Sequence, residues 1–246
     1  MNVKLSLRSA VVITTATAIA AAGLLVAPAP AATKTTVVMT EPTPLTSINP
    51  SVSEMNLATN SDVVYPTGWG FYYPNNQQQL VPNTKFGTYR ITKNSKTDFQ
   101  VTYTVNPGQV WNDGVPITAV DLLLSHVISS SDYSKAAGLG DPTAAGVTAA
   151  FDSLGYGGVY DEHIVGNPVL SSDKMSLVLK YDTKIPDWDQ NAPGVFPVHT
   201  LEMLAAGKTT LPATAAEGQA MTDKFLADFN SKNTTSLKAM GAIWSK

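Results

Sequence analysis

Alternating apolar and polar positions predict two β-hairpins in the middle of the chain. Every second residue of Phe99–Val105 is apolar, so one face of this strand packs on a core while the other meets water. Residues 87–91 precede it across a polar connection and supply the partner strand. Residues 167–170 and 175–181 repeat the arrangement later in the chain. We therefore expect a mainly antiparallel sheet.

Apolar residues at helical spacing predict a few helices beside this sheet. Thr118 is a good N-cap, and Asp121 three residues later gives a shorter-armed capping box, so a helix is expected from there to about residue 129. The stretch 132–166 is rich in Gly, Ala and Ser, which indicates loops with one short helix. The remaining predicted elements are a strand at 35–39 and helices at 55–64, 200–206, 222–230 and 236–246.

The beginning of the chain has the three-part pattern of a secretory signal. Two basic residues and no acid precede an apolar run at 10–26, and Ala29, Pro30 and Ala31 supply a small-residue cleavage site. The alternative is an uncleaved membrane anchor, but the apolar run is short for a span, which needs about 20 residues. We expect residues 1–31 to be removed and the protein to be exported, to the extracellular space or the cell envelope.

Composition narrows the classes of function. The chain has 246 residues, of which 43% are hydrophobic, so it can build a core, whereas only 14% are charged. The net charge of −3 means that the chain lacks the excess of basic residues typical of nucleic-acid-binding proteins, which argues against a nucleic-acid partner. There is no cysteine, which excludes disulfides, thiolate metal sites, a cysteine nucleophile and a lipid anchor on an N-terminal cysteine.

The candidate chemical motifs do not favour catalysis. No two of the histidines His126, His163 and His199 have metal-ligand spacing, and His126 lies in an apolar helix where a packed histidine is expected. The run 161–163, Asp-Glu-His, is an acid–base cluster on which a secreted hydrolase could rest, but a solvated turn is the interpretation that we favour. We expect no enzymatic activity, no cofactor and no metal ion.

An unusual aromatic stretch provides the candidate binding residues. Five aromatic residues lie within 65–73 among glycines and prolines, without helical spacing. Two interpretations stay open, a buried strand end, since aromatic residues favour strands, or a loop of stacking surfaces that faces a cleft. If the second holds, the ligand-binding residues are Tyr65, Trp69, Phe71 and Tyr72.

One segment carries a family resemblance. Residues 110–121, VWNDGVPITAVD, resemble the signature W-S-D-G-x-P-x-T-A-x-D of the family 5 bacterial extracellular solute-binding proteins, the oligopeptide and dipeptide receptors of ABC importers. Residues 36–50 resemble the opening strand and turn of that family, and 172–179 resemble one of its hairpins. Residues 181–188 and 196–199 resemble its actinobacterial members.

The resemblance implies a fold and a domain organisation. Members have an α/β fold of two lobes, the type II periplasmic-binding-protein fold, and this chain is expected to be an N-terminal fragment, α+β and mainly antiparallel, without the second lobe. Residues 1–31 are then the signal peptide, and 32–61 the leading strand of the first lobe. Residues 62–200 form an inserted β-rich subdomain with the signature helix, and 201–246 a truncated helical segment that returns to the first lobe.

The resemblance also implies a function. The chain is expected to be the substrate-binding component of an ABC transporter, a monomer that captures an oligopeptide or another small solute and presents it to a membrane permease. The signature residues Trp111, Asp113, Gly114, Pro116, Thr118 and Asp121 are structural in this interpretation, and none is a ligand contact. The alternative is a secreted interaction or adhesion module, or a non-functional truncated receptor, without transport activity.

Overall fold

The computed structural model describes residues 38, 40–68 and 70–246. The chain divides into two compact units, Met1–Pro42 and Thr43–Lys246, and all described helices and strands belong to the second. The predicted signal peptide lies outside the described residues, as does nearly all of the strand predicted at 35–39.

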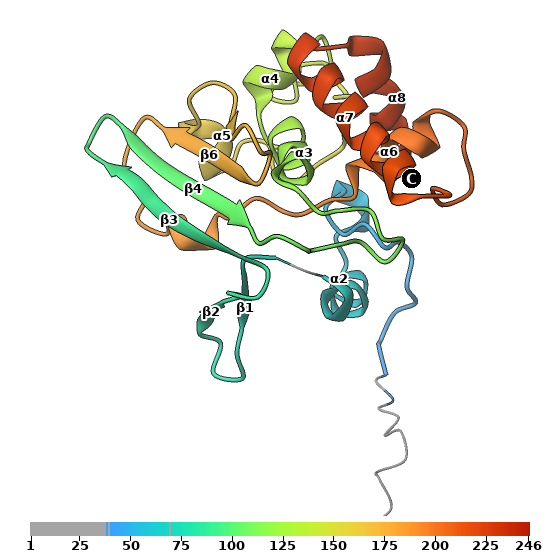
Figure 1. The fold of residues 1–246 in the computed structure, drawn as a ribbon, viewed down its shortest axis with the longest axis horizontal. Helices are drawn as coiled ribbons and strands as arrows, with labels where there is room; N and C mark the ends of the chain where they lie inside the picture. Colours follow the sequence, from blue (N-terminus) through green and yellow to red (C-terminus); the bar gives the residue numbers. More distant parts are fainter. Residues whose placement is uncertain (1–37, 39, 69) are drawn as a thin grey trace, which may run out of the picture. The chain divides into compact units, whose positions relative to one another are not determined.

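Two hairpins build a four-stranded antiparallel sheet, as their alternating sequences predict. β3 (Gly87–Asn94) pairs with β4 (Phe99–Val105), and β5 (Val169–Leu170) pairs with β6 (Ser176–Tyr181). β4 and β6 join the two hairpins, so the strand order is β3-β4-β6-β5 (Figure 1). The unit Thr43–Lys246 therefore combines helices with antiparallel sheet, and the predicted α+β organisation is confirmed.

One face of the sheet is buried by the residues that the alternation selects. On β4 these are Phe99, Val101, Tyr103 and Val105, and on β6 they are Leu177, Leu179 and Tyr181, none more than 2% exposed. Burying each large apolar side chain contributes about 1.5–3 kcal/mol. The core therefore forms between this face and the helices that cover it.

The signature segment folds as a turn that leads into a capped helix. Gly114 has a φ of 85°, which favours glycine, and its N–H donates to the Trp111 carbonyl at 2.9 Å. Thr118 caps the 3-10 helix η3 (Ala119–Leu122), which continues as α3 (Leu123–Val127), with both halves of the capping box present. The predicted turn and cap are confirmed, and the helix ends close to the expected position.

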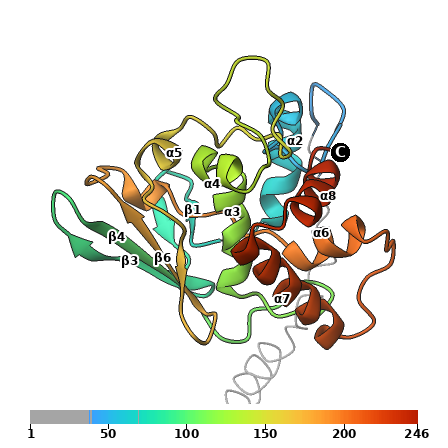
Figure 2. The same cartoon turned by 90° about the horizontal axis from the view of Figure 1, so that it is seen from above.

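Three helices near the end of the chain pack together. They are α6 (Val198–Ala205), α7 (Ala215–Ser231) and α8 (Thr234–Trp244), and Figure 2 shows α3 between them and the sheet. α7 starts well before the predicted residue 222, because the Thr214 hydroxyl caps it by accepting from the Glu217 N–H at 3.2 Å. Its first turns lack large apolar residues, so periodicity did not indicate them.

Two predictions for the other helices are wrong in detail. The stretch 132–166 was expected to contain one short helix but belongs to two, α4 (Ser131–Ala136) and α5 (Val159–His163). Ser130 caps α4 by accepting from the Tyr133 N–H at 3.2 Å. The helix predicted at 55–64 is divided between two elements, η1 (Ser53–Met55) and α2 (Ala58–Val64).

Short elements complete the unit. η2 (Tyr65–Thr67) directly follows α2, and η4 (Trp188–Gln190) lies in the loop before α6. β1 (Tyr72–Pro74) and β2 (Leu80–Pro82) pair as a small antiparallel sheet that the sequence did not indicate. Across the part of the chain that the structure describes, every helix is too short or too polar to cross a bilayer.

Candidate functional site

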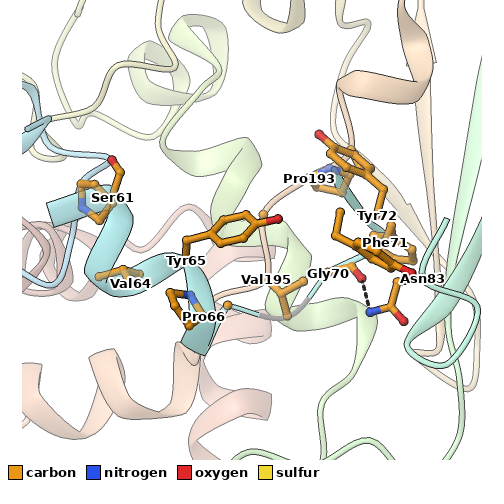
Figure 3. Close-up of a pocket in the computed structure, with 15 residues that line it drawn as sticks. Ser61, Val64, Tyr65, Pro66, Gly70, Phe71, Tyr72, Asn83, Pro193 and Val195 are labelled. Atoms are coloured by element: carbon orange, nitrogen blue, oxygen red, sulfur yellow. Dashed lines mark hydrogen bonds between the residues drawn. The ribbon is translucent and has the colours of Figure 1, made fainter. Parts of the chain in front are cut away.

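A groove of about 660 Å³ lies between the aromatic stretch and the loop before α6 (Figure 3). α2 and η2 form one wall, and the start of β1 together with Asn83 forms another. The loop 192–195, Ala-Pro-Gly-Val, closes the third side. The groove therefore joins segments that are more than a hundred residues apart in the sequence.

The α2 wall is held in place by a buried amide. Asn60 is fully buried, and its Oδ1 accepts from the Thr46 N–H at 3.0 Å while its Nδ2 donates to the Met55 carbonyl at 2.8 Å. Ser61 and Tyr65, four residues apart, line the groove together. Figure 3 shows the Tyr65 ring directed toward Pro193 and Tyr72.

The β1 wall has one buried and one half-buried ring. Phe71 is only 2% exposed and packs edge-on against Phe86 and Tyr103, with ring centroids 5.0 and 5.3 Å away. Tyr72 donates its hydroxyl to the Gln190 carbonyl at 2.6 Å, which ties this wall to the opposite loop. Burial raises the pKa of Tyr72, and its neighbours Tyr89 and Asp189 raise it further, so the hydroxyl stays protonated.

Asn83 fixes the backbone where the aromatic stretch enters β1. Its N–H donates to the Phe71 carbonyl at 2.7 Å, and its Nδ2 donates to the Gly70 carbonyl at 3.0 Å. Because both bonds act on adjacent residues, they set the direction in which Phe71 enters the core and Tyr72 faces the groove. The side chain is thus a positioning residue of the groove.

The third wall packs closely around Gly194. The Gly194 carbonyl accepts from the Ser125 hydroxyl of α3 at 3.1 Å. A Cβ on Gly194 would lie 2.7 Å from the Phe196 ring, a distance that real Cβ atoms essentially never show. A side chain at this position would have to displace the Phe196 ring. The loop presents Pro193 and Val195 to the groove.

Three of the four residues that the sequence predicts as ligand contacts line this groove. Tyr65, Phe71 and Tyr72 all line the groove, although Phe71 is mainly a core residue. Trp69 lies outside the described residues. Sequence reasoning missed several further lining residues, among them Ser61, Tyr73, Asn83, Pro193 and Val195. The Pro-Gly pair in the last of these segments signals a turn, but nothing along the chain connects it to the aromatic stretch.

Two of the signature residues take part in buried polar contacts with α6 and its start. Asp113 Oδ2 and His199 Nε2 are 2.9 Å apart, and their side chains are 4% and 1% exposed. The Asp121 carboxyl is fully buried, which raises its pKa to about 7, although the backbone N–H groups of Thr118 and Val198 lower it. These contacts join the signature turn to α6, in keeping with a structural role.

Trp111 also lines a second hollow, a location that the sequence did not indicate. This hollow measures about 950 Å³ and shares Pro50, Val64, Gly68 and Val195 with the groove. The same hollow is bordered by Trp244 near the end of α8, whose indole N–H donates to the Asp152 carbonyl at 2.7 Å. Trp244 is itself 5% exposed and belongs to the core.

Asp161 and His163 of the acid–base cluster contact different partners rather than each other. Asp161 Oδ1 accepts from the Ser131 N–H at 2.7 Å, and His163 Nδ1 lies 3.0 Å from Asp182 Oδ1. His126 is buried, as expected, with Nδ1 2.8 Å from the Tyr160 hydroxyl, and burial lowers its pKa to about 4. Within the described ranges, no group of three or more His, Cys, Asp or Glu side chains could hold a metal ion.

Comparisons with known proteins give weak similarities. No protein-family model and no curated protein matches this chain. Among solved structures, it is similar to the periplasmic EDTA-binding protein EppA, with 17% identity and a TM-score of 0.47 over 63% of this chain and 26% of that one. It is also similar to the oligopeptide-binding protein from Thermus thermophilus complexed with a pentapeptide, with 17% identity and a TM-score of 0.43 over 74% of this chain and 29% of that one. The chain thus spans less than a third of either structure.

Proposed function

We propose that this chain is the solute-capturing component of an import system, a receptor of the family 5 type that binds an oligopeptide or a similar solute outside the cytoplasm. The observation that carries the proposal is the groove of about 660 Å³, whose aromatic and proline walls come from three separate segments. A concave site of this size, mostly apolar with a few polar groups, is typical of small-ligand sites, which measure about 300–1,000 Å³.

The groove can bind a solute without chemical conversion of it. The rings of Tyr65 and Tyr72 offer flat apolar surfaces, and aromatic side chains contribute much of the affinity of binding sites. Among its described lining residues the groove has no paired carboxylates and no histidine, the groups most often used in general acid–base catalysis. Capture is therefore the activity that these residues support, with Tyr65, Trp69, Phe71 and Tyr72 as the proposed ligand-binding set.

The remaining parts of the proposal come from the sequence. The signal at residues 1–31 is the basis for export, and the signature at 110–121 is the basis for a partner permease in the membrane and for a monomeric receptor. The domain organisation inferred from the same resemblance, with a leading strand, an inserted subdomain and a returning helical segment, belongs to this proposal as well.

Equilibrium dialysis against a pool of short peptides tests the proposal. We expect the full chain to retain peptides and Tyr65→Ala to retain at least about tenfold less, because the ring contributes contact area at the groove. Tyr65 is 58% exposed, so its truncation leaves the core intact. The matched control is Val169→Ala, which truncates a side chain that is 64% exposed and lies outside the groove.

Two outcomes would contradict the proposed function. The first is that no peptide is retained, and the second is that Tyr65→Ala and Val169→Ala retain as much as the unmodified chain. Either result would favour the alternative of an interaction or adhesion module, which needs no enclosed site.

A further inference from the structure

Three aromatic rings meet at the side of the groove that Tyr72 forms. Tyr72 belongs to β1, Tyr89 to β3 and Trp188 to η4. The Tyr89 ring centroid lies 6.3 Å from that of Tyr72 and 5.6 Å from that of Trp188, and the ring planes are inclined by 60° and 61°. The three side chains pack against the core but are only half-buried, so part of this aromatic surface meets water. The faces of aromatic rings are electron-rich and attract cations.

Two tyrosine hydroxyls hold η4 beside these rings. The Tyr72 hydroxyl donates to the Gln190 carbonyl at 2.6 Å, and the Tyr103 hydroxyl donates to the Asn191 carbonyl at 3.5 Å. Each hydroxyl has one proton to donate, so both protons are used on the backbone. Asp189 lies between Trp188 and Gln190 in the same short helix. Its position is therefore fixed by contacts of η4 with the two tyrosines.

The Asp189 carboxylate has no counter-ion in the part of the chain that the structure describes. Its side chain is half-buried, and among the described residues it forms neither an ion pair nor a hydrogen bond. Burial raises the pKa values of Tyr72 and Tyr89, and the negative charge of Asp189 raises both further. No described lysine or arginine lowers either pKa, so the charge of Asp189 is not neutralised at this place.

The carboxylate and the rings favour the same kind of ligand. A carboxylate that is partly removed from water loses hydration, and a counter-ion would compensate for the loss. A cation beside it gains Coulomb energy where the effective dielectric constant is below that of water, and the ring faces attract it as well. An anion is repelled by Asp189, and an uncharged ligand gains neither contribution. Selection at this place therefore depends on the charge of the ligand.

From this agreement we infer that the edge of the groove at Tyr72 binds a cationic group of the ligand, an ammonium or a guanidinium, which pairs with Asp189 and lies against the aromatic rings. The inference rests on the proposed function and defines its substrate class, peptides or similar solutes that have a positive charge. Tyr72 belongs both to the ring cluster and to the groove lining, so one ligand can occupy both.

A metal ion is the rival occupant, and the residues present disfavour it. Ca²⁺ takes six to eight oxygen ligands, several of them carboxylates. Within the described ranges no group of three or more His, Cys, Asp or Glu side chains could hold a metal ion, so Asp189 would be a poor site by itself. An organic cation needs only one carboxylate and gains contact with the rings, which a hydrated metal ion does not.

Calorimetric titrations of the full chain with matched peptides test this inference. The lysine probe is acetyl-Ala-Ala-Lys-Ala-Ala-amide, and two further probes replace its lysine with norleucine or with glutamate. We expect the lysine probe to bind at least about tenfold more tightly than the norleucine probe, and the glutamate probe to bind most weakly, because only lysine can pair with Asp189.

A fourth probe distinguishes the two sources of an ammonium group. It contains norleucine and has a free amino terminus in place of the acetyl group. If it binds about tenfold more tightly than the acetylated norleucine probe, and this gain is lost in Asp189→Asn, an N-terminal ammonium also occupies the position, which supports the inference.

Asp189→Asn separates charge from shape. It should reduce the preference for lysine over norleucine to less than about twofold and leave the affinity for the norleucine probe unchanged. Asp132→Asn is the matched control, because it removes the same charge from a side chain that is 89% exposed and borders a different hollow. This variant should keep the full preference for lysine.

The contrary outcomes separate this inference from the proposed function. If the lysine and norleucine probes bind equally tightly and Tyr65→Ala weakens both, the proposed function stands and the cation preference is overturned. The inference is also overturned if the preference persists in Asp189→Asn, or if Ca²⁺ binds in an Asp189-dependent way and excludes the lysine probe. If no probe binds in a Tyr65-dependent way, both proposals fall.

Discussion

At the scale of single residues, the pair of Asp113 and His199 connects the signature turn to the start of α6. Burial alone raises the pKa of Asp113, but the hydrogen bonds from His199 and from the Val115 N–H outweigh it and lower the pKa below its ordinary value. Because the pKa is lower in the folded state, the carboxylate contributes stability above its unfolded pKa, and this contribution is lost as the pH falls through the folded pKa.

We expect His199→Ala to lower the free energy of unfolding by about 3 kcal/mol, because it leaves the buried Asp113 carboxylate without its main partner. Urea denaturation at neutral pH measures this loss. His163→Ala is the control, since His163 pairs with Asp182 at the surface, where such pairs contribute at most about 1 kcal/mol. Equal losses of unfolding free energy in the two variants would show that the buried pair stabilises the fold no more than the surface pair does.

Asp121 should give the opposite dependence on pH. Burial raises its pKa to about 7, so the folded state holds the proton after the unfolded state has released it. Its stabilising contribution is therefore complete below the unfolded pKa of about 4 and declines as the pH rises to about 7. Asp121→Asn retains an oxygen that can accept from the Thr118 N–H but cannot titrate.

We accordingly expect the unmodified chain to lose stability relative to Asp121→Asn between about pH 4 and pH 7. Urea denaturation of both proteins at several pH values across this interval measures the difference. Parallel stability curves would mean that Asp121 does not titrate in the interval.

At the scale of elements, the sequence predicted those strands, helices and caps that are determined by residues close together in the chain. The strands β3, β4 and β6 and the helix α8 follow hydrophobic periodicity, and the Thr118 cap follows from residue type and spacing. β1 and β2 were not predicted because each has only three residues and ends in a proline, which is unfavourable within a sheet. Periodicity compares positions along the chain, so it could not show that loop 192–195 lines the same groove as Tyr65 and Tyr72.

The packing of α8 gives a prediction at this scale. A Cβ on Gly241 would lie 2.2 Å from the Ala150 carbonyl oxygen, so the helix approaches this backbone more closely than alanine permits. In an exposed helix Gly→Ala would add about 1 kcal/mol of stability. We expect Gly241→Ala instead to lower the free energy of unfolding by about 1–3 kcal/mol through overpacking.

Thermal or urea unfolding measures this change. Lys238→Ala, on the exposed side of the same helix, is the control and should change stability by no more than about 0.5 kcal/mol. A more stable Gly241→Ala variant would show that the contact with Ala150 can relax.

At the scale of the whole unit Thr43–Lys246, the sheet and α3 act as a scaffold for the groove. Phe71 anchors the aromatic stretch in the core, and Ser125 of α3 holds loop 192–195 through the Gly194 carbonyl. Asn60 fixes α2 on the remaining side. The three walls are therefore held by contacts with the core, with α3 and with Asn60. These contacts fix the shape of a groove whose described lining has no charged side chains.

The most direct test of solute capture in this groove is amide chemical-shift mapping of the full chain by NMR, during a titration with the peptide that dialysis retains best. The amides of Gly68, Gly70 and Val195 line the groove and should shift with the peptide, whereas those of Gly166 and Lys232, which border a different hollow, should not. Shifts confined to residues outside the groove, with Gly68, Gly70 and Val195 unchanged at saturation, would contradict the assignment of the binding site.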